Sequence, residues 1–335
     1  WELDLFGAKR RTAEGAAAQA QARIADLADT QVSLTANVAR AYVDLRADQQ
    51  RAALAEASLG LHQQMLALEQ QRAAAGTVSQ DDLVQLAQQV QQDQANLAPL
   101  RAEISVQLDQ LAILTGQLPG ALDAALAAPT PVPMPPAQVA VGDPALLLRQ
   151  RPDIRSAERN IAARNAAIGQ HLADYFPKVT LLGDIGFSST NISRLFNGNA
   201  FSVLAAPMIS WTPFDFGRTE AAVSQARAGR DEAVAKYQST VLKALQDAED
   251  SLARYGAQRQ NLQALAQAYG LAQRSAGFAR QRAAQGTISH LQMLSAQRDL
   301  DSARDRFIQA QARTTEDYIA LQKSLGLGWQ APGQG

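Results

Sequence analysis

The sequence predicts a mainly α-helical protein that carries one β-hairpin suited to a membrane. Three observations support this fold class: a segment that occurs twice at a fixed spacing, a proline-free heptad pattern in each copy, and a stretch of period two just before the second copy. Each copy predicts a pair of long antiparallel helices packed as a coiled coil, and the stretch of period two predicts two β-strands.

The duplication is visible residue by residue over roughly 120 positions. Trp1 and Gly7 return as Trp211 and Gly217, and QRAAAGTVS at 71–79 returns as QRAAQGTIS 210 residues later. The offset stays constant, so neither copy has gained an insertion. An uninterrupted repeat of this length indicates one internally symmetric architecture rather than two unrelated domains. Because the chain opens in the middle of the repeating unit, we expect a preceding segment in the natural protein.

The composition excludes several classes of function. The 335 residues carry a formal net charge of −1, whereas nucleic-acid binding needs a concentrated basic surface. There is no cysteine, which excludes disulfides and thiolate metal sites. No run of 18 apolar residues occurs, so no transmembrane helix is expected. Aromatic residues make up only 5%, and the many alanines favour close helix–helix contact over a conventional globular core.

The proline-free stretches predict two very long helices, from about 9 to 75 and from about 218 to 285. At 1.5 Å per residue each would be about 100 Å long, a length that requires support from neighbouring helices. The heptad seam of the first helix is Leu34, Val38, Ala41, Leu45, Asp48, Ala52, Ala55, Leu59, His62 and Leu66. That of the second is Leu245, Ala248, Leu252, Tyr255, Arg259, Leu262 and Ala266.

Each long helix ends in a short Gly-Thr-(Val/Ile)-Ser loop that reverses the chain. Gly76 and Gly286 stand where a helix C-terminus favours a left-handed residue, and the serines three positions later can cap the next helix. The returning helices are predicted from about 80 to 115 and from about 290 to 325, about half as long as their partners.

A shorter helix is predicted from about 144 to 175, where Pro152 and Asp153 suit a first helical turn. Its length of roughly 30 residues, added to the roughly 36 of a returning helix, equals that of a long helix. We therefore expect two short helices stacked end to end beside each long one. The proline-rich stretch from 119 to 136 reads as an irregular connector that crosses the helical layer at mid-height.

From 176 to 211 the apolar period changes from 3.6 to 2, with a polar turn at 189–199. Each arm has about 11 residues, the length that a tilted strand needs to cross a bilayer. One apolar and one polar face fit a membrane barrel with a wet lumen, and they also fit a soluble hairpin with one buried face. Two strands cannot close a barrel, so the chain must oligomerise to hide their edges. The residues predicted to face the membrane are Val179, Leu181, Ile185, Phe187, Phe201, Val203, Ile209 and Trp211.

Several motifs resemble those of outer-membrane efflux factors. They are WELDLFG at 1–7, LRQRPDIRSAE at 148–158, AAIG at 166–169, YFPKV at 175–179 and LGLGW at 325–329. Their order and their spread over the whole chain are similar to the TolC/OprM/NodT type, and the Arg-Pro-Asp motif points to its lipoprotein branch, which is partnered with RND pumps.

The resemblance implies a homotrimer in which three chains share a 12-stranded β-barrel in outer-membrane lipid above a periplasmic α-barrel. It implies a signal peptide and a lipid anchor on a preceding segment, a periplasmic adaptor and an inner-membrane RND-type pump as partners, and no cofactor. The chain then divides into the end of a first membrane hairpin (1–7), a first periplasmic helical hairpin (8–116), an equatorial connector (117–143), a short stacked helix (144–175), an outer-membrane hairpin (176–214), a second periplasmic helical hairpin (215–326) and a C-terminal tail (327–335).

The two loops at the periplasmic end are the main candidate site. The resemblance implies that they close the channel at rest and contact the adaptor, and their small residues would allow a partner backbone to approach. The predicted contact residues are Arg72, Gly76, Thr77, Val78, Ser79, Arg282, Gly286, Thr287, Ile288 and Ser289. A possible gate consists of Asp81 and Asp82 after the first loop, with Gln292 and Ser295 after the second. Rings of carboxylates would favour cations, although acidic residues in a first helical turn also stabilise the helix itself.

No nucleophile triad, phosphate-binding loop or pair of catalytic carboxylates is recognisable, and the three histidines show no metal-ligand spacing. The sequence thus predicts a non-enzymatic exit duct that passively conducts substrates expelled by a pump. Two alternatives stay open: a duct for type I protein secretion, and a soluble coiled-coil scaffold. The scaffold explains the heptads but not the stretch of period two.

Overall fold

The computed structural model describes residues 1–75, 79–136, 150–187 and 201–327. The chain forms two compact units, one from Trp1–Asp29 with Ala145–Leu245 and one from Thr30–Pro144 with Gln246–Gly335. The first is the strand unit and the second is the tip unit. The two longest helices contribute residues to both.

Long helices dominate the structure, as the heptads predict. Helices α1 (Ala8–Ala74) and α6 (Arg218–Ala284) have 67 residues each, and α2 (Gln80–Leu114) and α7 (His290–Ser324) have 35 each. The matched lengths reflect the duplication. These segments are rich in alanine, glutamine, leucine and arginine, which have high helix propensity. Helix α2 continues through Pro99, which stands at an exposed position.

In the strand unit, α5 (Pro152–Leu172) is followed by a single 3₁₀ turn, η1 (Ala173–Tyr175). Pro152 occupies the first turn of α5, and the Asp153 carboxylate accepts a hydrogen bond of 2.7 Å from Arg151. This agrees with the predicted helix start, whereas 144–149 lie outside the described residues. Helix α5 approaches α1 closely at Gly15. A Cβ at this position would lie 3.4 Å from the Cβ of Ala166.

The strands form one antiparallel sheet in the order β1-β2-β3, where β1 is Glu2–Leu3, β2 is Lys178–Phe187 and β3 is Phe201–Ser210. The β2–β3 hairpin agrees with the stretch of period two, and its predicted turn lies outside the described residues. The register pairs Val179 with Ile209, Ile185 with Val203 and Phe187 with Phe201. Because paired residues share a face, the predicted membrane-facing residues Val179, Leu181, Ile185, Val203 and Ile209 lie on one side of the sheet. Trp211 follows the end of β3.

One proline lies within the hairpin. Pro207 pairs with Leu181. The Leu181 N–H donates to the carbonyl of Trp1 at 2.6 Å, and the Leu181 carbonyl accepts from the Trp1 amino group at 2.8 Å. The polar groups of Leu181 therefore point toward β1, and the ring nitrogen of Pro207 points away from β2. The proline removes no hydrogen bond from the hairpin.

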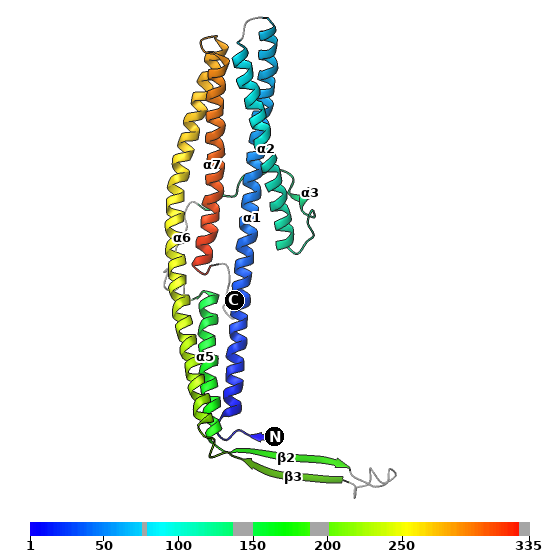
Figure 1. Ribbon diagram of the computed structural model, residues 1–335, viewed down its shortest axis with the longest axis vertical. Helices are drawn as coiled ribbons and strands as arrows, with labels where there is room; N and C mark the ends of the chain where they lie inside the picture. The colour runs from blue at the N-terminus through cyan, green and yellow to red at the C-terminus, as the bar shows by residue number, and fades with distance from the viewer. Residues whose placement is uncertain (76–78, 137–149, 188–200, 328–335) are drawn as a thin grey trace. The chain divides into compact units, whose positions relative to one another are not determined.

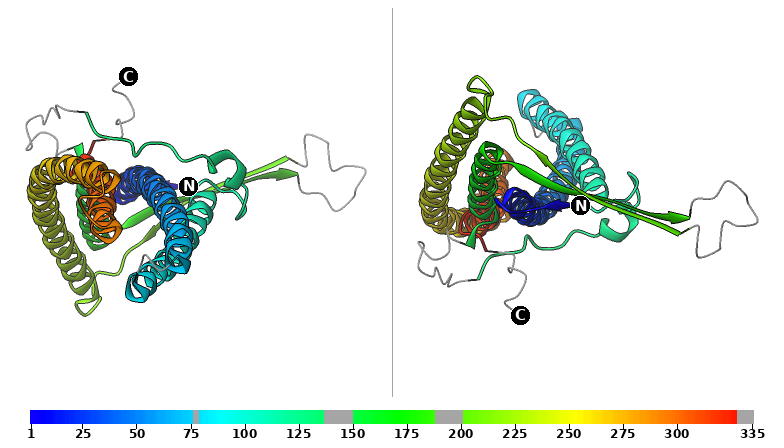
Figure 2. Two further views of the ribbon diagram at one scale, coloured as in Figure 1. Left: turned by 90° about the horizontal axis from the view of Figure 1, so that it is seen from above. Right: turned by 90° about the horizontal axis from the view of Figure 1, so that it is seen from below.

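In the tip unit, α2 lies alongside α1 and α7 lies alongside α6 (Figures 1 and 2). The core consists of small separate clusters along the helices instead of one globular centre. Three of these clusters are Ala41, Leu45, Leu108 and Leu111 between α1 and α2; Val43, Ala47, Leu54, Val132, Ile308 and Ala312 between α1, α7 and the connector; and Met65, Leu86 and Leu294 near the loops.

The proline-rich connector packs on the middle of α1. Arg46 donates to the carbonyl of Ala128 at 2.8 Å, and Thr315 of α7 donates to that of Pro133 at 2.6 Å. These bonds fix an otherwise irregular segment. The prediction of an irregular connector missed one short helix, α3 (Asp123–Leu126), and 137–143 lie outside the described residues. The end-to-end stacking of short helices stays a prediction.

Candidate functional site

The loop between α6 and α7 has the local chemistry that its sequence predicts. Gly286 has φ +70°, in the left-handed region, and the N–H of Thr287 returns to the carbonyl of Arg282 at 2.9 Å. Ser289 caps α7 in a capping box with Gln292. Gln292, predicted as a gate residue, is thus also a helix cap.

In the loop between α1 and α2, Gly76, Thr77 and Val78 lie outside the described residues. Ser79 caps α2 by accepting from the N–H of Asp81 at 3.1 Å. The carboxylate of Asp81 accepts from Gln85 at 2.8 Å. Both observations fit the view that the acidic residues stabilise the first turn of α2.

A polar link that the sequence analysis missed joins the end of α1 to the start of α7. The carboxylate of Glu69, which is buried, pairs with Nδ1 of His290. Arg72 lies 3.3 Å from the same carboxylate and 3.3 Å from the His290 ring. Arg72, a predicted adaptor-contact residue, thus also takes part in contacts within the chain. No signal in the sequence pairs residues 221 positions apart.

The two loops border a shared pocket of about 330 Å³. Predicted site residues from both copies of the repeat meet there, and these are Arg72, Ser79, Asp82, Gly286, Ile288 and Ser289. Arg282, Thr287 and Gln292 line a neighbouring depression with Phe278, and Ser295 lines a separate cleft farther along α7. The structure therefore brings together the predicted contact residues that it describes, in two neighbouring depressions, and leaves the predicted gate residue Ser295 apart.

A polar layer lies between the helices away from the loops. Ser58 donates to Asp301 at 2.7 Å, and Arg51 pairs with Asp305 at 2.7 Å, so both contacts join α1 to α7. His62 interrupts the predicted seam and is 1% exposed. Its Nδ1 lies 2.5 Å from the carboxylate of Asp93 on α2, a partner that no pattern in the sequence indicates.

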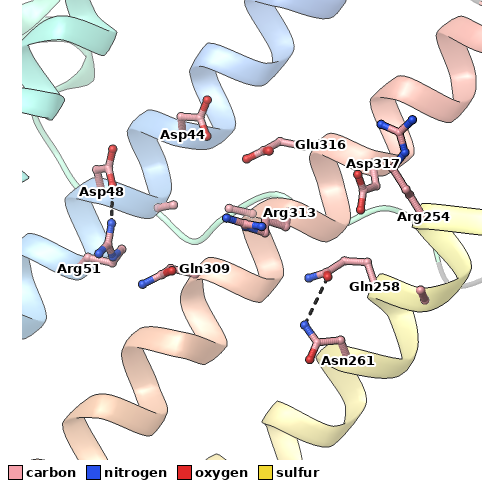
Figure 3. Close-up of a pocket in the computed structure, with 13 residues that line it drawn as sticks. Asp44, Asp48, Arg51, Arg254, Gln258, Asn261, Gln309, Arg313, Glu316 and Asp317 are labelled. Carbon is pink, nitrogen blue, oxygen red and sulfur yellow. Dashed lines mark hydrogen bonds and ion pairs between the residues drawn. The ribbon is translucent and has the colours of Figure 1, made fainter. Parts of the chain in front are cut away.

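A second cleft, of about 650 Å³, is lined by charged residues of α1, α6 and α7 (Figure 3). Burial raises the pKa of Glu316 to about 7, and a hydrogen bond with Asp44 adds to the shift. Burial also raises the pKa of Asp48 and of Asp317. In its protonated form the Glu316 carboxyl donates this hydrogen bond to Asp44.

Aromatic side chains gather where the strands meet the helices. Tyr175 donates to Glu220 at 2.5 Å, and the indole N–H of Trp211 donates to the Tyr175 carbonyl at 3.1 Å. Phe214 and Phe216 are 85% and 103% exposed. Polar tips that are anchored beside exposed rings are typical of a membrane interface.

An apolar-faced β-hairpin joined to paired long helices is the architecture expected of a membrane channel protein. Among the described helices, none combines the length and hydropathy needed to span a bilayer. Residues 1–117 and 144–327 match the family described as "Outer membrane efflux protein". The chain belongs to this family.

Similar proteins agree with this assignment. The solvent efflux pump outer membrane protein SrpC of Pseudomonas putida is 34% identical over 98% of this chain and 70% of that protein. OprJ of Pseudomonas aeruginosa is 32% identical over 98% of this chain and 68% of that protein. The solved structure of the outer-membrane channel OprN has a TM-score of 0.88 and 36% identity, covering 99% of this chain and 74% of that one.

The resemblance to the TolC/OprM/NodT type is thereby confirmed, together with the predicted fold class. The protein is an outer-membrane efflux factor, the exit duct of a tripartite efflux system, and it is not an enzyme.

Proposed function

We propose that three copies of this chain form a passive conduit through the outer membrane, and that its helical loops contact a periplasmic adaptor of an inner-membrane RND-type pump. We propose small molecules rather than proteins as cargo, because relatives carry the names of solvent, toluene and antibiotic efflux pumps. A lipid anchor on a preceding segment belongs to the same proposal.

The observation that best supports the proposed conduit is the register of β2 and β3. It places Val179, Leu181, Ile185, Val203 and Ile209 on one face, and Ile185 and Ile209 are 73% and 69% exposed. An apolar face of this kind needs lipid or another sheet to cover it. The outer edge of β3 also has unpaired backbone groups in the described chain, which strands of further copies would satisfy in a closed barrel.

The conduit is tested with the natural gene product, extracted from outer membranes with detergent. A trimer by native mass spectrometry that forms stable water-filled pores in planar bilayers is the expected result. A monomer, or a trimer without conductance, contradicts the proposal. Metabolic labelling with palmitate tests the lipid anchor on the same material.

The adaptor contact is tested at Arg282, beside the loop between α6 and α7. We expect Arg282→Glu to reduce co-purification of the adaptor by at least tenfold and to leave the trimer intact. The matched control is Arg259→Glu, because Arg259 is an exposed arginine of the same helix, 23 residues from Arg282. Equal loss in both variants would refute a contact at the loop.

A further inference from the structure

The face of the β2–β3 hairpin that would line the water-filled interior carries apolar as well as polar side chains. Its polar residues are Lys178, Thr180, Asp184 and Ser210. The same face also carries Leu182, Leu204 and Met208, which are 53%, 63% and 49% exposed. The interior of a membrane barrel is normally polar, so three large apolar side chains in contact with water need an explanation.

The register gathers these apolar residues around Ala206. Leu204 and Met208 precede and follow Ala206 by two positions on β3, and Leu182 of β2 is directly opposite Ala206. Directly paired residues have Cβ atoms about 5 Å apart. The patch therefore extends about 13 Å along β3, from Leu204 to Met208. A small organic molecule is large enough to cover it.

A carboxylate borders this apolar patch. Asp184 pairs with Leu204 and stands two positions from Leu182 on β2, so the three residues share one face. The Asp184 side chain is exposed and forms no ion pair with any residue in the described part of the chain. The patch thus combines a negative charge with three apolar side chains.

Lipid does not suit this face. Asp184 lies in the middle of β2, and a charged group that faced hydrocarbon at this depth would cost free energy. The opposite face, which includes Ile185 and Ile209, contains no charged residue and is the one predicted to contact lipid. The molecule that covers the patch must therefore come from the interior, through which the proposed cargo passes.

The chemistry of the patch favours a molecule with two properties. A small inorganic cation gains only a weak attraction to an exposed carboxylate in water. A neutral apolar molecule gains only by removing apolar surface from water. An organic cation can place its charged group beside Asp184 and its apolar body over the neighbouring side chains, and it gains from both. One side of this molecule stays in water, so binding is reversible, as a duct that must release its cargo requires.

We propose that this face is a contact site for organic cations with an apolar body, such as alkylammonium and arylammonium compounds, on the inner wall of the duct. Asp184 attracts the ammonium group, and Leu182, Leu204 and Met208 contact the apolar body. The inference rests on the proposed conduit, because this face must line the interior, and it adds a chemical class of cargo that the wall contacts. Each of the three copies supplies one site.

Protection of an engineered thiol measures binding at the patch, since the chain has no cysteine of its own. Ala206→Cys places a reporter at the centre of the patch, and Ser210→Cys places a control on the same face about 13 Å away. Both variants of the natural gene product are reconstituted in liposomes and alkylated with iodoacetamide, a small neutral reagent. Mass spectrometry of the reporter peptide gives the rate. The probes are hexyltrimethylammonium and tetramethylammonium, which differ only in the apolar chain.

Hexyltrimethylammonium should halve the alkylation rate of the Ala206→Cys reporter at a concentration at least tenfold below that of tetramethylammonium. Neither cation should protect the Ser210→Cys control. Adding Asp184→Asn should raise the half-protecting concentration of both cations at least fivefold. Adding Met208→Ser should reduce the advantage of the hexyl chain to less than threefold. The matched change Ile209→Ser removes an apolar side chain from the opposite face and should leave that advantage unchanged.

The outcomes separate a failure of the site from a failure of the conduit. Equal protection of the two reporters, or protection that survives both Asp184→Asn and Met208→Ser, would overturn the site. A trimer that conducts but shows no protection would also refute the site and leave the conduit intact. If iodoacetamide cannot reach the Ala206→Cys reporter even without a cation, lipid or another sheet covers this face, and the conduit itself is wrong.

Discussion

Replacing Ile185 by lysine should prevent stable insertion of the hairpin, whereas the same change at Leu204 should not. Ile185 and Leu204 are both large, apolar and well exposed, at 73% and 63%, and they lie at nearly the same height of the hairpin. They differ in the face that they occupy, because Ile185 pairs with Val203 and Leu204 pairs with Asp184. Ile185 belongs to the face predicted to contact lipid, whereas Leu204 shares the opposite, mixed face with Asp184, Leu182 and Met208.

The expected cost follows from the depth of Ile185. At about 3.3 Å per residue and a tilt of about 45°, the 10 residues of β2 span about 23 Å, close to the apolar band of an outer-membrane barrel. Ile185 lies two to three residues beyond the centre of the strand, about 6 Å from the midplane. A lysine near this depth costs about 2 kcal/mol per copy, which reduces the folded fraction about 30-fold for each strand.

The assay is the yield of extracted trimer and its folding into liposomes during urea titration, followed by conductance of whatever inserts. Ile185→Lys should lower the yield and the urea midpoint. Leu204→Lys should leave both near the wild-type values and shift ion selectivity toward anions, because its charge would face the water-filled interior. Similar losses of yield and urea midpoint in the two variants would refute the assignment of faces. If neither variant lowered the yield or the midpoint, a soluble hairpin would be favoured.

Three further predictions concern the tip unit. His62→Leu should destabilise the helices by about 3–5 kcal/mol in urea unfolding followed by circular dichroism, because it leaves the carboxylate of Asp93 buried without its partner; adding Asp93→Leu should recover most of the loss. The pKa of Glu316 is raised in the folded protein, so the stability that its protonation contributes is present below the unfolded pKa near 4.5 and is lost as pH rises through about 7. Glu316→Gln should flatten this decline between pH 4.5 and 7, and an unchanged profile would contradict the assignment. Glu69→Ala should raise amide hydrogen exchange in the first turns of α7 about tenfold, since a link of about 1.4 kcal/mol to His290 is lost, and unaltered exchange would show that the link does not hold α7.

The sequence predicted the helices closely because the signals that start and end them are local. The second long helix was expected at 218–285 and is Arg218–Ala284, and its returning partner was expected at 290–325 and is His290–Ser324. Glycine in a left-handed conformation and a serine cap are both encoded within a few residues of the loop.

The packing of the helices was predicted less completely. In the single chain the predicted seam of α1 is exposed at Leu34 (43%), where Val32 and Ala36 are buried instead, and that of α6 is exposed at Leu245 and Leu252 (43% and 47%). Helix α1 contacts both α2 and α7, so it has two apolar stripes, whereas a heptad search finds only one. Val43 and Leu54 belong to the stripe that was missed.

The contacts of the candidate site depend on residues far apart in the chain, and periodicity carries no information about them. His62 and Asp48 were recognisable as polar interruptions of a seam, but the sequence did not reveal their partners. The pairing of Asp44 with Glu316 joins distant parts of the chain. It becomes visible only when α1 and α7 are placed side by side.

Pro207 affects how readily the free edge of β3 can pair with another strand. Its ring nitrogen faces the outer edge of β3, so that edge lacks one N–H donor. Any strand that pairs there, from another copy of the chain or from a stray one, leaves one of its own carbonyls without a partner, which weakens pairing at that point. A single chain of the proposed conduit therefore has a β3 edge that is less favourable for strand addition than an unbroken row of donors and acceptors would be.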